Sequence, residues 1–351
     1  MAVYTTIDDA GSYFNPKIYT GNGTAIGSGG NALTGVGFQP DFTWIKNRDV
    51  TDFHVLTDAV RGVTKYIKSN NNDAEVTNAE SLTGFDADGF TVGDMNEVNT
   101  NTEAFVAWNW KAGTTSGIAG SPSITPTSYS FNATSGFSTI TYDGTGSAAT
   151  LPHGLGVAPK AVIVKRLDVA TDWQVYHETV GATEYLRLDD NMAPATSSTV
   201  WNDTAPTSTL FSIGTASEVN NSSGNYVAYC FAGKQGYSKF DGYTGNGDVD
   251  GAFIYTGFRP AMFIVKETSG TQGWTMIDNK RSPFNPTDGT LHPSGTAAED
   301  TSSDFFVDLL SNGFKIRDTD TVFNGDGQTY VYFAWAESPL VNSKGVPTNA
   351  R

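Results

Sequence analysis

The chain has 351 residues, of which 38% are hydrophobic, 12% aromatic and only 17% charged. A net charge of −16 and the lack of any basic run exclude nucleic acid and an anionic membrane surface as expected partners, because both are bound through cationic side chains. The 38 Gly residues and the many β-branched and aromatic residues suit tight turns and strands, so the composition predicts an all-β fold.

Four landmarks recur three times in the same order along the chain. They are an aromatic residue before a glycine turn, a proline leading into an apolar run that ends in lysine, an aromatic-led strand, and a pair of late strands. In the three copies they start at Tyr19, Tyr142 and Tyr243, at Pro40, Pro159 and Pro260, at Phe53, Trp173 and Trp274, and at Phe90, Phe211 and Phe314. The distance from the proline to the aromatic-led strand is 13, 14 and 14 residues, so we infer a threefold internal repeat.

Each copy is predicted to consist of strands. Residues 260–266 form an apolar run that starts at a proline, as expected of a buried strand. Residues 88–93, DGFTVG, carry the Asp-Gly signal of a hairpin, and residues 226–231 are apolar throughout, as in a central strand. A unit of about 100 residues fits one β-sandwich, although a small barrel would produce a similar pattern.

The predicted organisation is therefore three tandem, related β-sandwich domains. The domains are expected at residues 1–111, 128–233 and 234–340. Residues 112–127, rich in Gly, Ser, Thr and Pro, are expected to be a linker, and residues 341–351 a C-terminal tail. The sequence leaves open whether the three copies line up or close into a trefoil.

No metal, cofactor or catalytic site is predicted. The histidines do not have metal-ligand spacing and are expected to be ordinary surface or half-buried residues: His54, His153, His177 and His292. A calcium loop starting at Asp86 would need a glycine at position 91, which is Thr91, so Asp88-Gly89 is interpreted as a hairpin turn.

Three further features are candidate sites of chemistry or binding. Asp189 and Asp190 could serve as a glycosidase acid and base, but a solvated loop edge is the preferred interpretation. Cys230, the sole cysteine, is expected to be a small buried residue in a chain that folds without disulfides, as in a reducing cytoplasm. Six of the seven tryptophans lie on repeat landmarks and are expected in the core, whereas Trp201 lies off them and is the candidate exposed binding contact.

The segments GFQPDFTWIK, GFRPAMFIVK and DGFTVG, and the ending from residue 330, YVYFAWAESPLVNSKGVPTNAR, resemble a family of tailed-bacteriophage proteins. Members of this family, common in marine phages, are usually labelled tail fibre or uncharacterised virion protein. The resemblance covers nearly the whole chain. It implies a virion structural protein with jelly-roll or lectin-like β-sandwich domains, assembled in the host cytoplasm.

We therefore expect a non-enzymatic tail fibre or fibre-associated protein that contributes to host attachment. Its expected partners are other virion proteins of the tail or capsid, a host surface glycan, and further copies of itself, for example in a trimer. A capsid decoration or head-fibre protein is the alternative, and a polysaccharide depolymerase is the third hypothesis.

Overall fold

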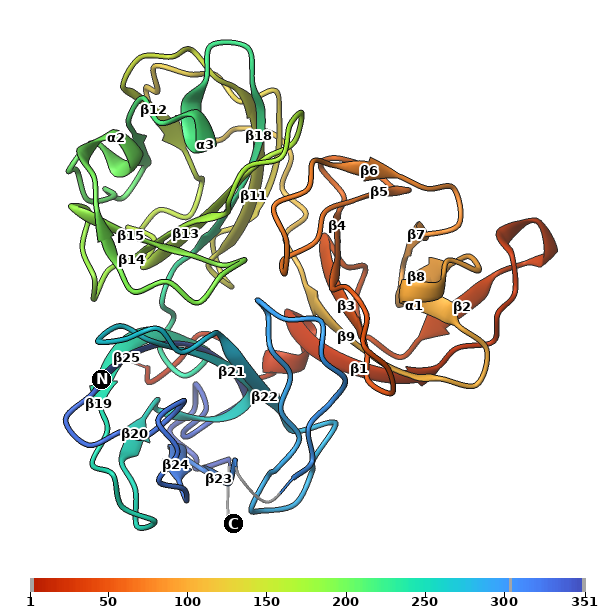
Figure 1. Cartoon of the computed structure of the whole chain (residues 1–351), viewed down its shortest axis with the longest axis vertical. Helices are drawn as coiled ribbons and strands as arrows, with labels where there is room; N and C mark the ends of the chain where they lie inside the picture. The colour runs from red at the N-terminus through yellow and green to blue at the C-terminus, as the bar shows by residue number, and fades with distance from the viewer. Residues whose placement is uncertain (1–2, 303–304, 349–351) are drawn as a thin grey trace.

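The structure is a computed structural model that describes residues 3–302 and 305–348 (Figure 1). Nearly all regular structure in these residues is strand, in antiparallel sheets, which confirms the all-β prediction. Three lobes surround a common centre: lobe 1 (residues 14–110), lobe 2 (residues 128–231) and lobe 3 (residues 238–339) (Figure 1). No helix within the described ranges is long and apolar enough to cross a membrane.

The bounds of the elements are as follows. The N-terminal segment and lobe 1 contain η1 (Ala10–Ser12), β1 (Phe14–Thr20), η2 (Ile26–Ser28), β2 (Asn31–Thr34), β3 (Phe42–Asn47), β4 (Val55–Asp58), β5 (Lys65–Tyr66), β6 (Val76–Thr77), β7 (Leu82–Asp86), β8 (Gly89–Val92), α1 (Asn96–Asn99) and β9 (Ala104–Trp110). Lobe 2 contains β10 (Ser128–Asn132), β11 (Phe137–Asp143), β12 (Ala149–Pro152), β13 (Ala161–Arg166), β14 (Gln174–His177), β15 (Glu184–Arg187), β16 (Ala195–Thr196), α2 (Ser198–Trp201), β17 (Leu210–Ile213), α3 (Ser217–Asn220) and β18 (Asn225–Phe231). Lobe 3 contains β19 (Ser238–Thr244), β20 (Phe253–Tyr255), β21 (Phe258–Glu267), β22 (Thr275–Asp278), β23 (Val307–Leu310), β24 (Gly313–Ile316) and β25 (Thr329–Pro339).

Each lobe has a large sheet whose four main strands follow the same order. The orders are β1-β9-β3-β4, β11-β18-β13-β14 and β19-β25-β21-β22, and β10, β15 and β16 extend the sheet of lobe 2. A smaller sheet accompanies each large one: β2-β8-β7, β12-β17 and β20-β24-β23. This recurring topology explains the recurring landmarks in the sequence.

The central strands of each large sheet, such as β3, β13 and β21, are buried on both faces, which explains the continuous apolar runs. On β9, Trp108 and Trp110 point to a core that takes residues from all three lobes. Phe105 and Ala107, on the opposite face, belong to a local core shared with β2 and β8. Because the largest core cluster spans all three lobes, the division into separate domains remains a prediction.

Three aromatic rings from equivalent strand positions meet where the lobes converge. Trp110 on β9, Phe231 on β18 and Trp335 on β25 have ring centroids 5.2 to 6.4 Å apart. A cavity of about 20 Å³ at this centre is lined by apolar and aromatic side chains of all three lobes. Such a cavity offers a water molecule no polar partner, so the centre is a packed hub. The copies thus close into a trefoil.

A buried asparagine holds the glycine turn of each lobe. In lobe 2 the Asn220 side chain accepts a hydrogen bond from Thr145 N–H at 2.7 Å and donates to the carbonyls of Ser147 and Gly214 at 2.6 and 2.8 Å. Asn99 and Asn324 hold the equivalent turns of lobes 1 and 3 in the same way. The amide satisfies backbone groups that the turn would otherwise leave unpaired.

The strand register moves the start of the aromatic-led strand in the first copy by one residue. The residue that precedes β4, β14 and β22 donates its backbone N–H to a side chain of the following segment in every lobe. The pairs are His54 with Asn70, Trp173 with Asp189, and Trp274 with Ser294. His54, and not Phe53, is therefore the copy-one equivalent of the two tryptophans, and the spacing from the proline becomes 14 residues in all copies.

The expected linker, residues 112–127, has no named strand but lies against lobe 2. Ile124 is buried in the lobe 2 core and donates its N–H to the carbonyl of Thr150 at 3.1 Å. In the expected tail, Ser343 N–H donates to Asp8 at 2.6 Å, while residues 349–351 lie outside the described part of the chain. The expected linker is thus docked on lobe 2, and the expected tail is docked on the N-terminal segment.

Candidate functional site

An arm follows the fourth strand of each large sheet and reaches the next lobe. Arm 1 comprises residues 59–79, arm 2 residues 178–197 and arm 3 residues 279–302. Hydrogen bonds show where each arm lands: Glu75 N–H donates to Leu167 O (2.8 Å), Trp274 Nε1–H to Arg187 O (2.6 Å) and Glu299 N–H to Arg48 O (2.8 Å). Lobe 1 thus contacts lobe 2, lobe 2 contacts lobe 3, and lobe 3 contacts lobe 1, which closes the ring and creates three equivalent clefts.

The cleft between lobes 1 and 2 contains a buried ion-pair network. The Arg61 guanidinium pairs with Asp58 at 2.6 Å and with Glu75 at 3.1 Å. From lobe 2, the Tyr229 hydroxyl donates to Asp58 at 2.7 Å. Burial opposes the charge of Arg61, but the Asp58 and Glu75 carboxylates outweigh it and hold the pKa of Arg61 above its ordinary value. Outside this network a hollow of about 390 Å³ remains, with Lys65 on its edge.

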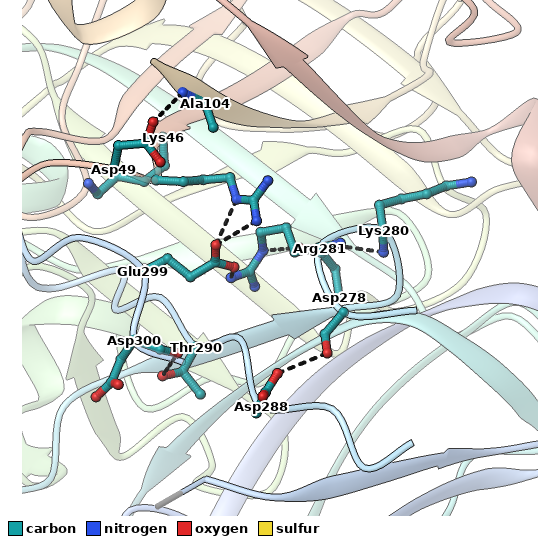
Figure 2. Close-up of polar contacts among 12 residues, drawn as sticks. Lys46, Asp49, Ala104, Asp278, Lys280, Arg281, Asp288, Thr290, Glu299 and Asp300 are labelled. Carbon is teal, nitrogen blue, oxygen red and sulfur yellow. Dashed lines mark hydrogen bonds and ion pairs between the residues drawn. The ribbon is translucent and has the colours of Figure 1, made fainter. Parts of the chain in front are cut away.

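The cleft between lobes 3 and 1 repeats this network and adds a second cation. Figure 2 shows the contacts of Asp278, Arg281 and Glu299. Arg281 pairs with Asp278 at 2.5 Å and with Glu299 at 2.8 Å, and Trp108 Nε1–H donates to Asp278 at 3.0 Å. Arg48 of lobe 1 pairs with the same Glu299 at 2.6 Å and so bridges the two lobes.

The cleft between lobes 2 and 3 lacks the network altogether. The strand register places His177 where the other lobes have aspartate, and Val180 follows where they have Arg61 and Arg281. Burial lowers the pKa of His177 to about 4, so the ring stays neutral, and it packs 5.2 Å from the ring of Phe333. The pairing of Glu184 with Thr196 places Pro194 at the position of Glu75 in lobe 1.

This cleft is consequently open, with a volume of about 550 Å³. It is lined by residues of arm 2 and of the rim of lobe 3: Thr179, Val180, Glu184, Ala193, Pro194, Asp241, Gly242, Tyr243, Thr244, Thr268, Thr329 and Tyr330. Among the described residues, the Glu184 carboxylate and the hydroxyls of Thr179 and Thr244 form no hydrogen bond or ion pair with another side chain. Asp241 pairs with Lys239 at 3.4 Å. Polar groups therefore stand free in this cleft.

The expectation that Trp201 is an exposed contact is wrong. Trp201 ends α2, is 2% exposed, and packs edge-on against Tyr176 with ring centroids 6.0 Å apart. Ser197 caps the helical turn by accepting the N–H of Thr199, and the turn directs the indole into the lobe 2 core. The other six tryptophans are also buried, as predicted.

The two candidate acid and base residues, Asp189 and Asp190, have structural roles. Asp189 accepts the backbone N–H of Trp173, where Asn70 and Ser294 do the same in the other lobes. Burial raises the pKa of Asp189 to about 7, while Asp190 pairs with Arg187 at 3.3 Å. An amide and a hydroxyl fill the same role elsewhere, so hydrogen-bond acceptance, and not acidity, is what the position requires.

The remaining candidates also have structural partners. Asp86 and Gly89 pair across the β7–β8 hairpin, as the turn interpretation predicted, and Asp88 accepts the N–H groups of Gly35 and Gly37. Cys230 is fully buried, and burial raises the pKa of its thiol. His54, His153 and His177 are buried rather than on the surface. Within residues 3–302 and 305–348, no group of three His, Cys, Asp or Glu side chains could hold a metal ion.

Sequence reasoning missed the open cleft. The signal would have been an alignment of the three copies at His54, which places Val180 opposite two arginines.

No curated protein and no solved structure matches the chain. Residues 9–339 match a family model described as a domain of unknown function (DUF7483), and because this match spans most of its length, the chain belongs to that family.

Proposed function

We propose that this chain is a structural protein of a tailed-phage particle, a tail fibre or fibre-associated protein that contributes to host attachment. Its three sandwich-like lobes serve as tandem β-sandwich domains joined in a ring, and further copies of the chain and other virion proteins are its partners. The resemblance of GFQPDFTWIK, GFRPAMFIVK and the C-terminal segment to phage virion proteins supports this proposal.

The observation that carries the attachment role is the cleft between lobes 2 and 3. Among the residues that the structure describes, it alone of the three equivalent clefts lacks the buried arginine and carries an unpaired carboxylate, Glu184. A scaffold that fills the depth of two clefts with buried ion pairs and leaves the third, of about 550 Å³, without them is suited to binding at the third. We propose binding rather than cleavage, because Asp189 has the same structural role as Asn70 and Ser294.

Quantitative mass spectrometry of purified particles, with head and tail fractions separated, tests the proposal. Far fewer copies than the major capsid protein, found in the tail fraction, are expected. A copy number near that of the capsid protein, found in the head fraction, would overturn the tail assignment in favour of capsid decoration. Absence from the particle would overturn both the tail and the capsid assignment, and a free depolymerase would then be the hypothesis to test.

A further inference from the structure

We propose that the cleft between lobes 2 and 3 binds a neutral or amino-bearing segment of a carbohydrate chain, and that Glu184 disfavours acidic sugars. This inference rests on the proposed attachment function and names the ligand of the same site.

In this cleft both partners of the buried ion pair are replaced together. Val180 replaces the buried arginine and Pro194 replaces the glutamate that pairs with it in the other clefts. Losing one partner alone would leave a buried, uncompensated charge, which is strongly destabilising. Losing both partners leaves no buried charge, and the position of the aspartate is occupied by His177, which stays neutral. The cleft is therefore stable while open.

The lining contains both hydroxyl and aliphatic groups. Thr179 and Thr244 present hydroxyls without a partner in the described chain, and Val180, Ala193 and Pro194 provide apolar surface beside them. A pyranose ring offers the complementary surface, since its faces carry C–H groups and its rim carries hydroxyls. The volume of about 550 Å³ lies within the roughly 300–1,000 Å³ range of ligand pockets.

The charge of the lining restricts the sugar. In the described part of the chain, the charged residues of the lining are Glu184, which has no partner there, and Asp241, which pairs with Lys239, and the lining contains no Lys or Arg. A uronate or sulfate would meet Glu184 without a compensating cation, whereas an amino group would form a charge-assisted hydrogen bond with it. In lobe 1 the same position is Lys65, so the negative charge is a property of this cleft and not of the repeat.

Isothermal titration of the full chain with three soluble trisaccharides tests the proposal. The probes are the trimers of glucosamine, glucose and galacturonic acid, which are cationic, neutral and anionic. We expect the glucosamine trimer to bind most tightly, the glucose trimer more weakly, and the galacturonic acid trimer not to bind. Glu184→Lys should weaken binding of the glucosamine trimer by about tenfold or more.

Two further variants make the test specific to the site. Lys65→Glu is the matched control, because it changes the equivalent exposed position of lobe 1 and should leave binding unchanged. Thr268→Arg introduces the side chain that Arg48 contributes to the cleft between lobes 3 and 1, and it should block the glucosamine and glucose trimers alike. Circular dichroism verifies that each variant is folded.

Three results would overturn the inference: no binding of any trimer, equal binding of the galacturonic acid trimer, or binding insensitive to both Glu184→Lys and Thr268→Arg. The location of the chain in the particle is measured separately. It decides the proposed function whichever way the titration turns out.

Discussion

Replacing Arg281 by methionine should destabilise the folded chain by about 3–5 kcal/mol. The Arg281 side chain is 0% exposed and neutralises both Asp278 and Glu299. Methionine keeps the apolar length but leaves these carboxylates without their shared cation, in a site where water cannot replace it. Since Arg48 still pairs with Glu299, the penalty falls mainly on Asp278. Asp278→Asn in the same chain removes the stranded charge and should recover much of the loss.

Denaturant unfolding, followed by circular dichroism and tryptophan fluorescence, measures the effect. Because one core spans the three lobes, the two signals should report a single transition. Arg317→Met is the control: its side chain is 43% exposed, and its ion pair with Asp308 should be worth less than about 1 kcal/mol. Equal losses for Arg281→Met and Arg317→Met would refute the view that the buried network holds lobes 3 and 1 together.

Two other predictions concern the repeat itself. Because burial raises the pKa of Asp189 to about 7, the native chain holds more protons than the unfolded chain between pH 3.8 and about 7, so stability falls as pH rises through that window. Asp189→Asn should remove this loss of stability, and at pH values above 7 it should raise the denaturant concentration at the midpoint of unfolding. An unchanged dependence of stability on pH would contradict the raised pKa of Asp189. Asn220→Ala leaves Thr145 N–H and two carbonyls without their partner and should cost about 2–3 kcal/mol in denaturant unfolding, whereas Asn191→Ala, on the surface, should cost almost nothing.

The strands and their recurrence were predictable because a strand buried on both faces requires a continuous apolar run, as at residues 226–231. The closed ring of lobes was not predictable from the sequence, since nothing within one copy indicates that Trp110, Phe231 and Trp335 meet at one point. Their contact depends on how the lobes dock, which is a property of side chains far apart in sequence. Trp201 was misjudged for a local reason: it lies off the repeat landmarks, yet a single helical turn returns it to the core.

The three lobe interfaces share their geometry but differ in chemistry, and this difference specifies the order of the lobes. In one interface Tyr229 donates to Asp58, and in another Phe333 packs against the neutral ring of His177. If lobe 3 docked where lobe 2 belongs, Phe333 would face Asp58, and a buried carboxylate would lose its donor at a cost of about 1–3 kcal/mol. Identical interfaces would allow permuted docking and exchange of lobes between chains. The same divergence removes the ion-pair network from one interface, so the residues that fix the order of the ring also leave one of its clefts without buried charges to fill it.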